Sequence, residues 1–179
     1  SLGVFDDDLQ QLRPHPGQAV SAANVRLVAG NSEILAKSRE DFSRSHVQDA
    51  YSVRCSPQVT GAFRDTIDHA RRVADWELAA AVDNPVVALD GRVASNGNFH
   101  GAPVAYVLDF LAIVAADVAS MSERRTDRFL DVARNRGLNA FLADDPGVDS
   151  GHMIAQYTQA AIVSELKRNA APASADSIP

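Results

Sequence analysis

Residues 103–134 read PVAYVLDFLAIVAADVASMSERRTDRFLDVAR, and this stretch decides the fold that the sequence predicts. It follows the glycine-flanked turn SNGNFHG at residues 95–101 and predicts one long helix. The first half of the stretch is apolar nearly all round, and the second half is charged. A helix that is apolar on every side is normally buried, so we expect other helices to enclose the first half.

Two aspartates lie in the most apolar part of this helix, residues 102–121. A charged residue costs about 2.5–3.5 kcal/mol at the centre of a bilayer, so Asp109 and Asp117 indicate a buried helix of a soluble bundle rather than a membrane span. They lie eight residues apart on one side of the helix. We expect arginines or hydroxyls of neighbouring helices to pair with them, because an unpaired buried carboxylate is costly.

A second long helix is predicted upstream, from Pro57 to about Val82. Ser56 is a plausible N-cap, and a proline is tolerated at the first helical position because its missing N–H would be unpaired there anyway. The motif Asp83-Asn84-Pro85 should end the helix. Apolar residues recur mostly at spacings of three and four, which gives the helix one apolar face: Val59, Ala62, Phe63, Ile67, Ala70, Val73, Ala74, Leu78 and Ala81.

Shorter signals complete the pattern. Residues 16–28 suit a helix that is closed by a left-handed C-cap at Gly30-Asn31. Residues 38–46 are polar and predict a loop. Residues 150–169 predict a third long helix. The sequences VVAL and RVA on either side of Asp90-Gly91 predict the only hairpin. The sequence therefore predicts an all-α fold, a bundle of long helices with one small β-hairpin, in which residues 1–179 form a single segment.

The amino-acid composition limits the classes of partner that we expect this chain to bind. The formal net charge is −6, the pI is about 5.2, and no lysine or arginine cluster is longer than a pair. We therefore expect a small molecule or another protein as the partner, and not a nucleic acid or a membrane. Cys55 is the single cysteine, which excludes an intrachain disulfide and a thiolate zinc site and suits a reducing cytoplasm. The five histidines show no metal-binding spacing, so we expect no metal.

Two segments are candidates for a site. Gln48, Tyr51 and Arg54 lie three residues apart ahead of a helix, where Arg54 could bind a carboxylate with its planar fork. By chemistry alone this signal is weak, and the plainer interpretation is that Arg54 pairs with a surface acid while Tyr51 packs at the bundle edge. The turn at residues 96–101 holds Phe99 together with two asparagines and two glycines, and the backbone of such a turn can approach a ligand closely.

Each remaining candidate has a plain structural interpretation. Asn98 could simply cap the helix that follows the turn. Residues 122–125, SERR, are typical of a solvated or interhelical network of ion pairs, and Cys55 of a small buried side chain.

The motifs taken together resemble the aromatic amino acid lyase family and, within it, the bacterial histidine ammonia-lyases. The resemblance covers essentially the whole chain. Six motifs occur in that family's order and spacing: RPHPGQ at 13–18, QDAYSVRCSPQV at 48–59, VDNPVV at 82–87, SNGNFHGAPVA at 95–105, SERR at 122–125 and APASADSIP at 171–179.

This resemblance implies a cytoplasmic helical homotetramer with active sites built from more than one subunit. It implies elimination of ammonia from L-histidine to give trans-urocanate, the first step of histidine degradation. The electrophile would be 4-methylideneimidazole-5-one (MIO), formed from an Ala-Ser-Gly triplet. No such triplet occurs in the sequence, so the chain is expected to be a central segment of the lyase, lacking the MIO-forming region and the C-terminal part, and to be inactive by itself.

Residue roles follow from matching positions. Arg54 matches the arginine that binds the substrate carboxylate, Tyr51 the tyrosine beside the electrophile, Gln48 a pocket amide and Phe99 an aromatic that lines the cavity. Tyr51 and Arg54 are thus the expected catalytic residues, and Gln48, Arg54 and Phe99 the expected substrate-binding ones. Ala102 and His152 depart from the family's usual residues, but neither matches a catalytic position.

Two alternatives remain open. A phenylalanine or tyrosine ammonia-lyase or aminomutase has the same fold, and the residues that select the substrate would lie mainly outside this sequence. A helical interaction module without catalysis would also use exposed apolar helix faces.

Overall fold

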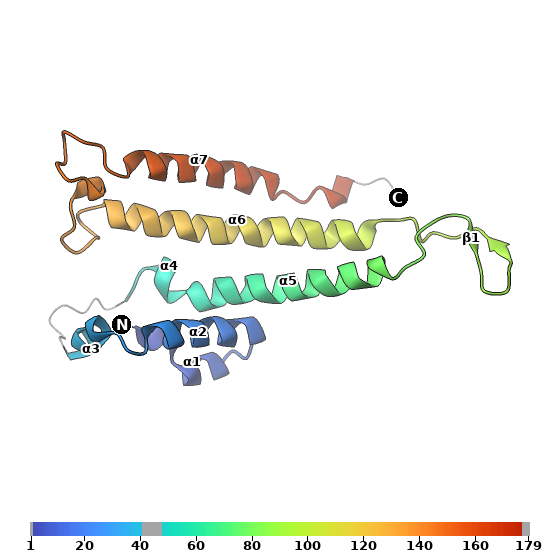
Figure 1. Ribbon diagram of the computed structural model, residues 1–179, viewed down its shortest axis with the longest axis horizontal. Helices are drawn as coiled ribbons and strands as arrows, with labels where there is room; N and C mark the ends of the chain where they lie inside the picture. The colour runs from blue at the N-terminus through green and yellow to red at the C-terminus, as the bar shows by residue number, and fades with distance from the viewer. Residues whose placement is uncertain (1, 41–47, 177–179) are drawn as a thin grey trace.

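The computed structural model describes residues 2–40 and 48–176, and four helices dominate it. They are α2 (Pro16–Ala29), α5 (Ser56–Leu78), α6 (Ala102–Leu130) and α7 (Met153–Asn169). Helix α2 packs on α5, α5 on α6, and α6 on α7, so the helices lie side by side in an elongated bundle (Figure 1). The predicted all-α fold is confirmed.

Short elements complete the described chain. The 3-10 helix η1 (Leu2–Phe5), α1 (Asp7–Gln11) and α3 (Glu33–Glu40) lie near α2, and α4 (Tyr51–Arg54) is a single turn before α5. The 3-10 helices η3 (Ala140–Leu142) and η4 (Ser174–Asp176) flank α7.

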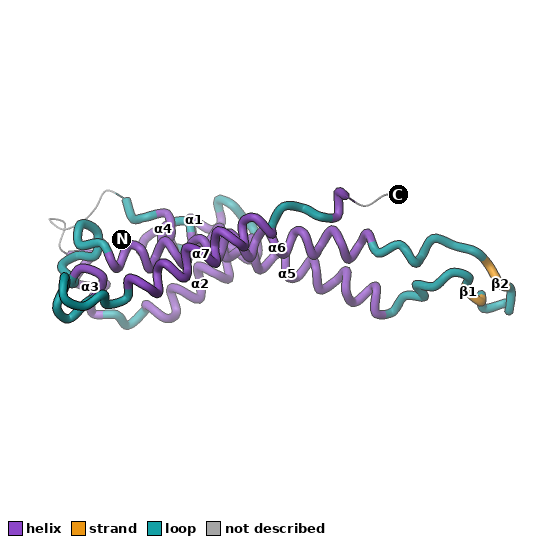
Figure 2. The backbone as a smooth tube through the Cα atoms, turned by 90° about the horizontal axis from the view of Figure 1, so that it is seen from above, coloured by secondary structure: helices purple, strands orange, loops and turns teal. Residues whose placement is uncertain are grey.

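The predicted hairpin is also confirmed. Strands β1 (Val86–Val87) and β2 (Val93–Ala94) pair antiparallel, with Val87 opposite Val93. Gly91 in the turn has φ +81°, a left-handed conformation that glycine adopts without strain. The hairpin projects beyond the ends of α5 and α6, at the end of the bundle away from α4 (Figures 1 and 2).

Helices α2 and α5 cross at two glycines, which allows their backbones to touch. The Gly17 N–H donates a 2.8 Å hydrogen bond to Oδ1 of Asp65 on α5. A Cβ atom added to Gly61 would lie 2.5 Å from the Cα atom of Gln18 and 2.8 Å from the carbonyl carbon of Gly17. No side chain fits at this crossing, so the two glycines set the distance between the helices.

The core between α5 and α6 is small. Ala70 and Val73 of α5 pack against Val107 of α6, and Leu111 covers them. The first half of α6 is not enclosed within this chain, because Tyr106 is 62% exposed and Leu108 57%. The expected enclosure is therefore only partly provided by α5 and α7.

Helix α6 is, within the described residues, the one helix long and apolar enough to cross a membrane. Its most apolar window has a mean hydropathy of 1.9, and 11% of that window is buried. Core helices pass the same test, so this property alone does not indicate a membrane span.

The two aspartates of α6 differ in their surroundings. Asp109 accepts hydrogen bonds from the backbone N–H groups of Ala173 (3.1 Å) and Ser174 (2.8 Å) and from the Ser174 hydroxyl. The Ser174 hydroxyl and these N–H groups lower the pKa of Asp109. The expected hydroxyl partner is confirmed for Asp109, whereas Asp117 is exposed, so its predicted burial is wrong.

Several predicted helix ends are wrong. Ser56 does not cap α5, because its hydroxyl donates to the Val53 carbonyl oxygen at 2.8 Å and Cys55 is the N-cap. Helix α5 ends at Leu78 rather than Val82, and α6 at Leu130 rather than Arg134, since Asp131 has an extended conformation.

At the C-terminal end of α2, Gly30 has φ −59°, so the left-handed C-cap that the sequence predicted there is wrong. The chain stays right-handed there and soon begins α3, which the sequence did not predict. The first three residues of the predicted loop at 38–46 belong to α3, and its residues from 41 lie outside the described part.

Candidate functional site

The single turn α4 places Tyr51 and Arg54 at one end of the bundle. Its N–H groups at Val53 and Arg54 donate to the Ala50 carbonyl oxygen at 2.9 and 2.8 Å. Nε of Arg125, on α6, donates to the carbonyl oxygen of the buried Ser52 at 2.8 Å. Helix α6 therefore fixes α4 from behind and leaves its outer face open.

The predicted pair Tyr51 and Arg54 is in direct contact. The central guanidinium carbon of Arg54 lies 4.7 Å from the centre of the Tyr51 ring, a cation–π distance. The Tyr51 side chain is exposed at 72%. The stack therefore directs an arginine and a phenol toward the open side of α4.

An open groove brings the predicted residues Gln48, Tyr51 and Arg54 together. Its volume is about 530 Å³, and its lining adds residues of the C-terminal end of α6 and the segment after it. The lining residues are Gln48, Asp49, Ala50, Tyr51, Arg54, Arg128, Ala133 and Arg134. The cationic side chains at its wall suit a carboxylate-bearing ligand.

A neighbouring groove shares Tyr51, Arg128 and Arg134 and reaches further along α6. Its volume is about 340 Å³, and Asp117, Ser120 and Met121 line its far part. Tyr51 therefore stands between the two grooves. The sequence did not single out Arg128 or Arg134, since no local spacing relates them to α4.

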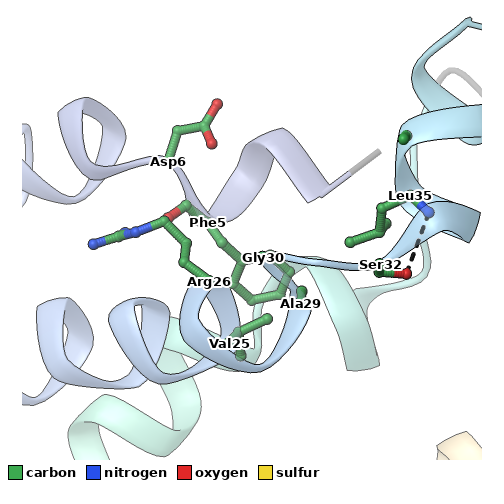
Figure 3. Close-up of a pocket in the computed structure, with 9 residues that line it drawn as sticks. Phe5, Asp6, Val25, Arg26, Ala29, Gly30, Ser32 and Leu35 are labelled. Carbon is green, nitrogen blue, oxygen red and sulfur yellow. Dashed lines mark hydrogen bonds between the residues drawn. The ribbon is translucent and has the colours of Figure 1, made fainter.

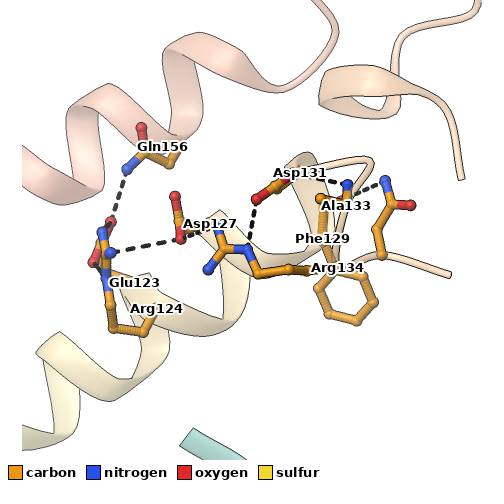
Figure 4. Close-up of polar contacts among 9 residues, drawn as sticks. Glu123, Arg124, Asp127, Phe129, Asp131, Ala133, Arg134 and Gln156 are labelled. Carbon is orange, nitrogen blue, oxygen red and sulfur yellow. Dashed lines mark hydrogen bonds and ion pairs between the residues drawn. The ribbon is translucent and has the colours of Figure 1, made fainter. Parts of the chain in front are cut away.

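A network of ion pairs supports this end of the bundle (Figure 4). Arg124 donates to both carboxylate oxygens of the buried Glu123 at 2.5 Å, and Nε2 of Gln156 on α7 donates to Glu123 at 2.7 Å. The hydrogen bonds from Arg124 are the main reason why the pKa of the Glu123 carboxyl is lowered. The same hydrogen bonds raise the pKa of the Arg124 guanidinium. The predicted network at residues 122–125 is confirmed, and Gln156 makes it interhelical.

The same network orients Arg134 at the groove. Arg134 lies 2.8 Å from Asp127 and 2.5 Å from Asp131. The pKa of Asp131 is lowered mainly by the hydrogen bond from the backbone N–H of Ala133 and, to a smaller extent, by the hydrogen bond from Arg134. Two carboxylates therefore constrain this arginine, although its side chain remains partly exposed.

Phe99 does not join the other predicted residues within this chain. It lies in the loop between β2 and α6, is 61% exposed, and is at the hairpin end of the bundle. Helix α5 separates this loop from α4, and its 23 residues span about 35 Å at 1.5 Å per residue. A ligand in the α4 groove therefore cannot touch Phe99 of the same chain.

The turn that holds Phe99 has its own hydrogen bonds. Asn84 Oδ1 accepts from the Asn96 N–H at 2.8 Å, and Asn96 Oδ1 accepts from the Asn98 N–H at 2.7 Å. Gly101 is the N-cap of α6, with no side-chain cap bond, so the alternative in which Asn98 caps that helix is wrong.

A separate pocket of about 240 Å³ lies among η1, α2 and the start of α3 (Figure 3). Its arginine, Arg26, already donates to the Phe5 carbonyl oxygen at 2.5 Å and pairs with Asp7 at 3.0 Å. None of the predicted site residues lines it. Across the described ranges 2–40 and 48–176, no group of three or more His, Cys, Asp or Glu side chains could hold a metal ion.

Fold and groove together define a helical-bundle protein with an arginine-lined polar site at one end. The chain belongs to the aromatic amino acid lyase family, whose family model matches residues 1–179.

Relatives within this family carry a more specific name. The chain is 68% identical over 176 residues to a histidine ammonia-lyase of Streptomyces avermitilis and 49% identical over 179 residues to one of Caldanaerobacter subterraneus. Each alignment covers nearly all of this chain, 98% and 99%, but 34% of the relative. The chain thus spans about a third of the length of these relatives.

Solved structures share the fold. A histidine ammonia-lyase from Trypanosoma cruzi matches with a TM-score of 0.84 and 39% identity, over 99% of this chain and 32% of that one. A tyrosine aminomutase from Streptomyces globisporus matches with a TM-score of 0.83 and 36% identity, over 99% of this chain and 37% of that one.

Proposed function

We propose that this chain is a central segment of a histidine ammonia-lyase, which eliminates ammonia from L-histidine and gives trans-urocanate. The observation that carries the proposal is the 68% identity to a relative of that name over nearly the whole chain. The groove that unites Gln48, Tyr51 and Arg54 supports it, because an amino acid substrate presents a carboxylate.

Arg54 is the proposed carboxylate ligand. Its guanidinium is planar and can form two parallel hydrogen bonds to a carboxylate, which fixes the orientation of the substrate as well as its position. Gln48, on the same groove, would donate or accept a further hydrogen bond. Tyr51 would face the reacting part of the substrate, because its ring stacks on Arg54 and most of its surface is open.

The family's electrophile, MIO, would come from a part of the protein beyond this sequence, since the sequence has no Ala-Ser-Gly triplet. The residues present fit a group supplied from outside, because Tyr51 is 72% exposed on the open side of α4. When bound, such an electrophile withdraws electron density and assists departure of the amine. The residues of this chain would bind and orient the substrate for that step.

A homotetramer with shared sites would explain the position of Phe99. Phe99 lies at the hairpin end and the groove at the α4 end, about the length of α5 apart. A second subunit running in the opposite direction would bring its Phe99 to this groove. The proposed partners are therefore an amino acid and further copies of the same protein, in the cytoplasm, without nucleic acid or membrane.

A second candidate is an aminomutase or an ammonia-lyase acting on tyrosine or phenylalanine. The similarity to a tyrosine aminomutase at 36% identity favours keeping it, because that structure matches as well as the histidine enzyme does. A helical interaction module without catalysis would leave all of these substrates unchanged.

The test is a substrate comparison with the full-length protein that contains this segment. L-Histidine, L-tyrosine and L-phenylalanine are supplied separately, and the unsaturated product is followed by its ultraviolet absorbance. We expect urocanate from histidine and little product from the aromatic amino acids. Preferred turnover of tyrosine or phenylalanine would support the second candidate, and no product from any of them would support the interaction module.

A further inference from the structure

The underside of the α4 groove holds two buried polar atoms that lack hydrogen-bond partners. A cavity of about 430 Å³ lies between the N-terminal elements and the junction of α4 with α5. It is lined by Val4, Leu9, Gln10, Tyr51, Arg54, Cys55 and Gln58. Within the described part of the chain, Nε of Arg54 and Oε1 of Gln58 are both buried and both without a partner.

These two atoms are chemically complementary. The Nε–H of an arginine is a donor, and the side-chain oxygen of a glutamine is an acceptor. The structure does not pair these two atoms with each other, although both residues line one cavity. A buried polar group without a partner is costly, so a turn of the Gln58 amide that brings its oxygen to the Arg54 Nε–H is expected to stabilise both groups.

The backbone places both side chains on one face. Gln58 follows Arg54 by four residues, and side chains four apart in a helix are neighbours. The chain departs from helical geometry at Cys55, with φ −95° and ψ 8°, but helical hydrogen bonds flank this residue on both sides. Cys55 N–H donates to the Tyr51 oxygen at 2.8 Å, and Val59 N–H donates to the Cys55 oxygen at 3.1 Å.

Gln10, the other amide in the cavity, already has its partners. Its Nε2 donates to the carbonyl oxygens of Val4 at 2.9 Å and Asp6 at 3.1 Å. Its Oε1 accepts from Nε2 of Gln18 at 2.9 Å. Gln10 is therefore committed to the N-terminal elements, and Gln58 is the amide left for Arg54.

We propose that Gln58 is a positioning residue for Arg54. After a turn of its amide, its Oε1 accepts a hydrogen bond from the Arg54 Nε–H, which the structure leaves unpaired, and so anchors the rear edge of the guanidinium. The stack on Tyr51 restrains the face of the guanidinium, and the two terminal nitrogens remain free to bind a carboxylate. This inference rests on the proposed role of Arg54 in binding an amino acid.

The test is a double-mutant cycle in the full-length protein. Gln58→Leu removes the acceptor at similar size and should raise KM for the amino acid about three- to tenfold, with a smaller change in kcat. In an Arg54→Lys background the same change should have almost no further effect, because lysine has no Nε–H. Gln58→Glu retains an acceptor and should restore KM to near the original value.

Gln159 on α7 is a matched control, since its Oε1 is also buried without a partner in the described residues and does not line the groove. Gln159→Leu should leave KM unchanged. If Gln58→Leu does not fold, Gln58→Met replaces it. An unchanged KM, equal effects in the two Arg54 backgrounds, or an equal effect of Gln159→Leu would overturn the proposal.

Binding of imidazolepropionate, which has the carboxylate but no amine to eliminate, separates this inference from the proposed function. Calorimetry on the same variants should show the same dependence of Kd on Gln58 through Arg54. If the binding cycle behaves as expected but no ammonia is released, the proposed function fails and the positioning role stands. Turnover without coupling between Gln58 and Arg54 would overturn the positioning role and leave the proposed function standing.

Discussion

The two ends of the α5–α6 pair are built differently. At the α4 end, side chains from separate elements interlock, as in the hydrogen bonds from Arg125 to Ser52 and from Gln156 to Glu123. At the hairpin end the hydrogen bonds stay within the loops, and Leu89 and Phe99 are exposed. The family resemblance assigns residues from both ends to one site, so the difference between the ends supports the proposal that one chain contributes to two separate sites.

The strongest way to test this comparison is to isolate the chain. Residues 1–179 alone should release no ammonia from histidine, because the electrophile is not in the sequence and Phe99 cannot reach the groove of its own chain. The exposed apolar faces of α6 and α7 should make the chain self-associate. Ultraviolet assay and size-exclusion chromatography check both points, and robust turnover by the isolated chain would contradict the proposed mechanism.

At the α4 end, Arg54→Lys in the full-length protein should lower kcat/KM about tenfold or more. Hydrogen bonds to charged groups contribute about 1.5–3 kcal/mol each, and lysine retains the charge but loses the planar fork. Steady-state kinetics on a variant of unchanged oligomeric state measure the loss. Unaltered kinetics would remove Arg54 from the site.

Mixing subunits of two impaired variants sharpens the same comparison. Assemblies formed from Arg54→Lys and Phe99→Ala subunits would contain some sites with both original residues, if those residues come from different subunits. The mixture should then be several-fold more active than either variant alone. Activity that only averages the two parents would place both residues on one chain's site.

Tyr51→Phe should reduce turnover and leave the melting temperature almost unchanged. The phenol is exposed, so its removal costs little packing, and phenylalanine keeps the stack with Arg54. Kinetics and a thermal melt of the same sample separate the two quantities. A large loss of stability with normal turnover would instead make Tyr51 a structural residue.

Gly61→Ala should destabilise the bundle by about 1–3 kcal/mol, because the added methyl group overlaps the backbone of α2. Gly97→Ala is the control at the hairpin end, where an added Cβ would meet no described atom within 4 Å apart from its chain neighbours. Urea unfolding of both variants measures the difference. Equal stabilities would mean that the crossing is looser than the structure indicates.

The smallest expected effect concerns pH. The folded chain lowers the pKa of Glu123 below its ordinary 4.5, so the stabilisation is present above that pH and is lost as pH falls through the folded pKa. Glu123→Gln should cost about 1 kcal/mol at pH 7 and less at pH 4. Urea unfolding at both pH values checks this, and an equal cost at both would assign the effect to packing.

Local patterns predicted more of the fold than of the site. Apolar spacing predicted α5, the long apolar stretch after a glycine-flanked turn predicted α6, and Asp90-Gly91 predicted the hairpin. The helix ends were harder to predict because residues 79–82 suit a helix, yet the α-helix stops at Leu78. No spacing could reveal that Ser56 turns back to Val53, since that choice depends on the preceding turn.

That Gln48, Tyr51 and Arg54 share one groove could be predicted because they are neighbours along the chain, whereas their roles rest on the family resemblance. Arg128 and Arg134 could not, because the packing of α6 beside α4 brings them to the groove. The turn that holds Phe99 was a candidate from its own residues, but Phe99 was placed in the same site as Arg54 only by resemblance. Its position at the far end required the three-dimensional arrangement of α5.

The stack of Arg54 on Tyr51 has a consequence for the entropy of binding. A free arginine side chain has about 2 kcal/mol of rotamer entropy to lose when it becomes ordered. Here the aromatic ring confines the guanidinium before any ligand arrives, at 4.7 Å. Part of the entropy cost of ordering the Arg54 side chain is therefore already met when the chain folds. A carboxylate that binds Arg54 then binds a preorganised guanidinium.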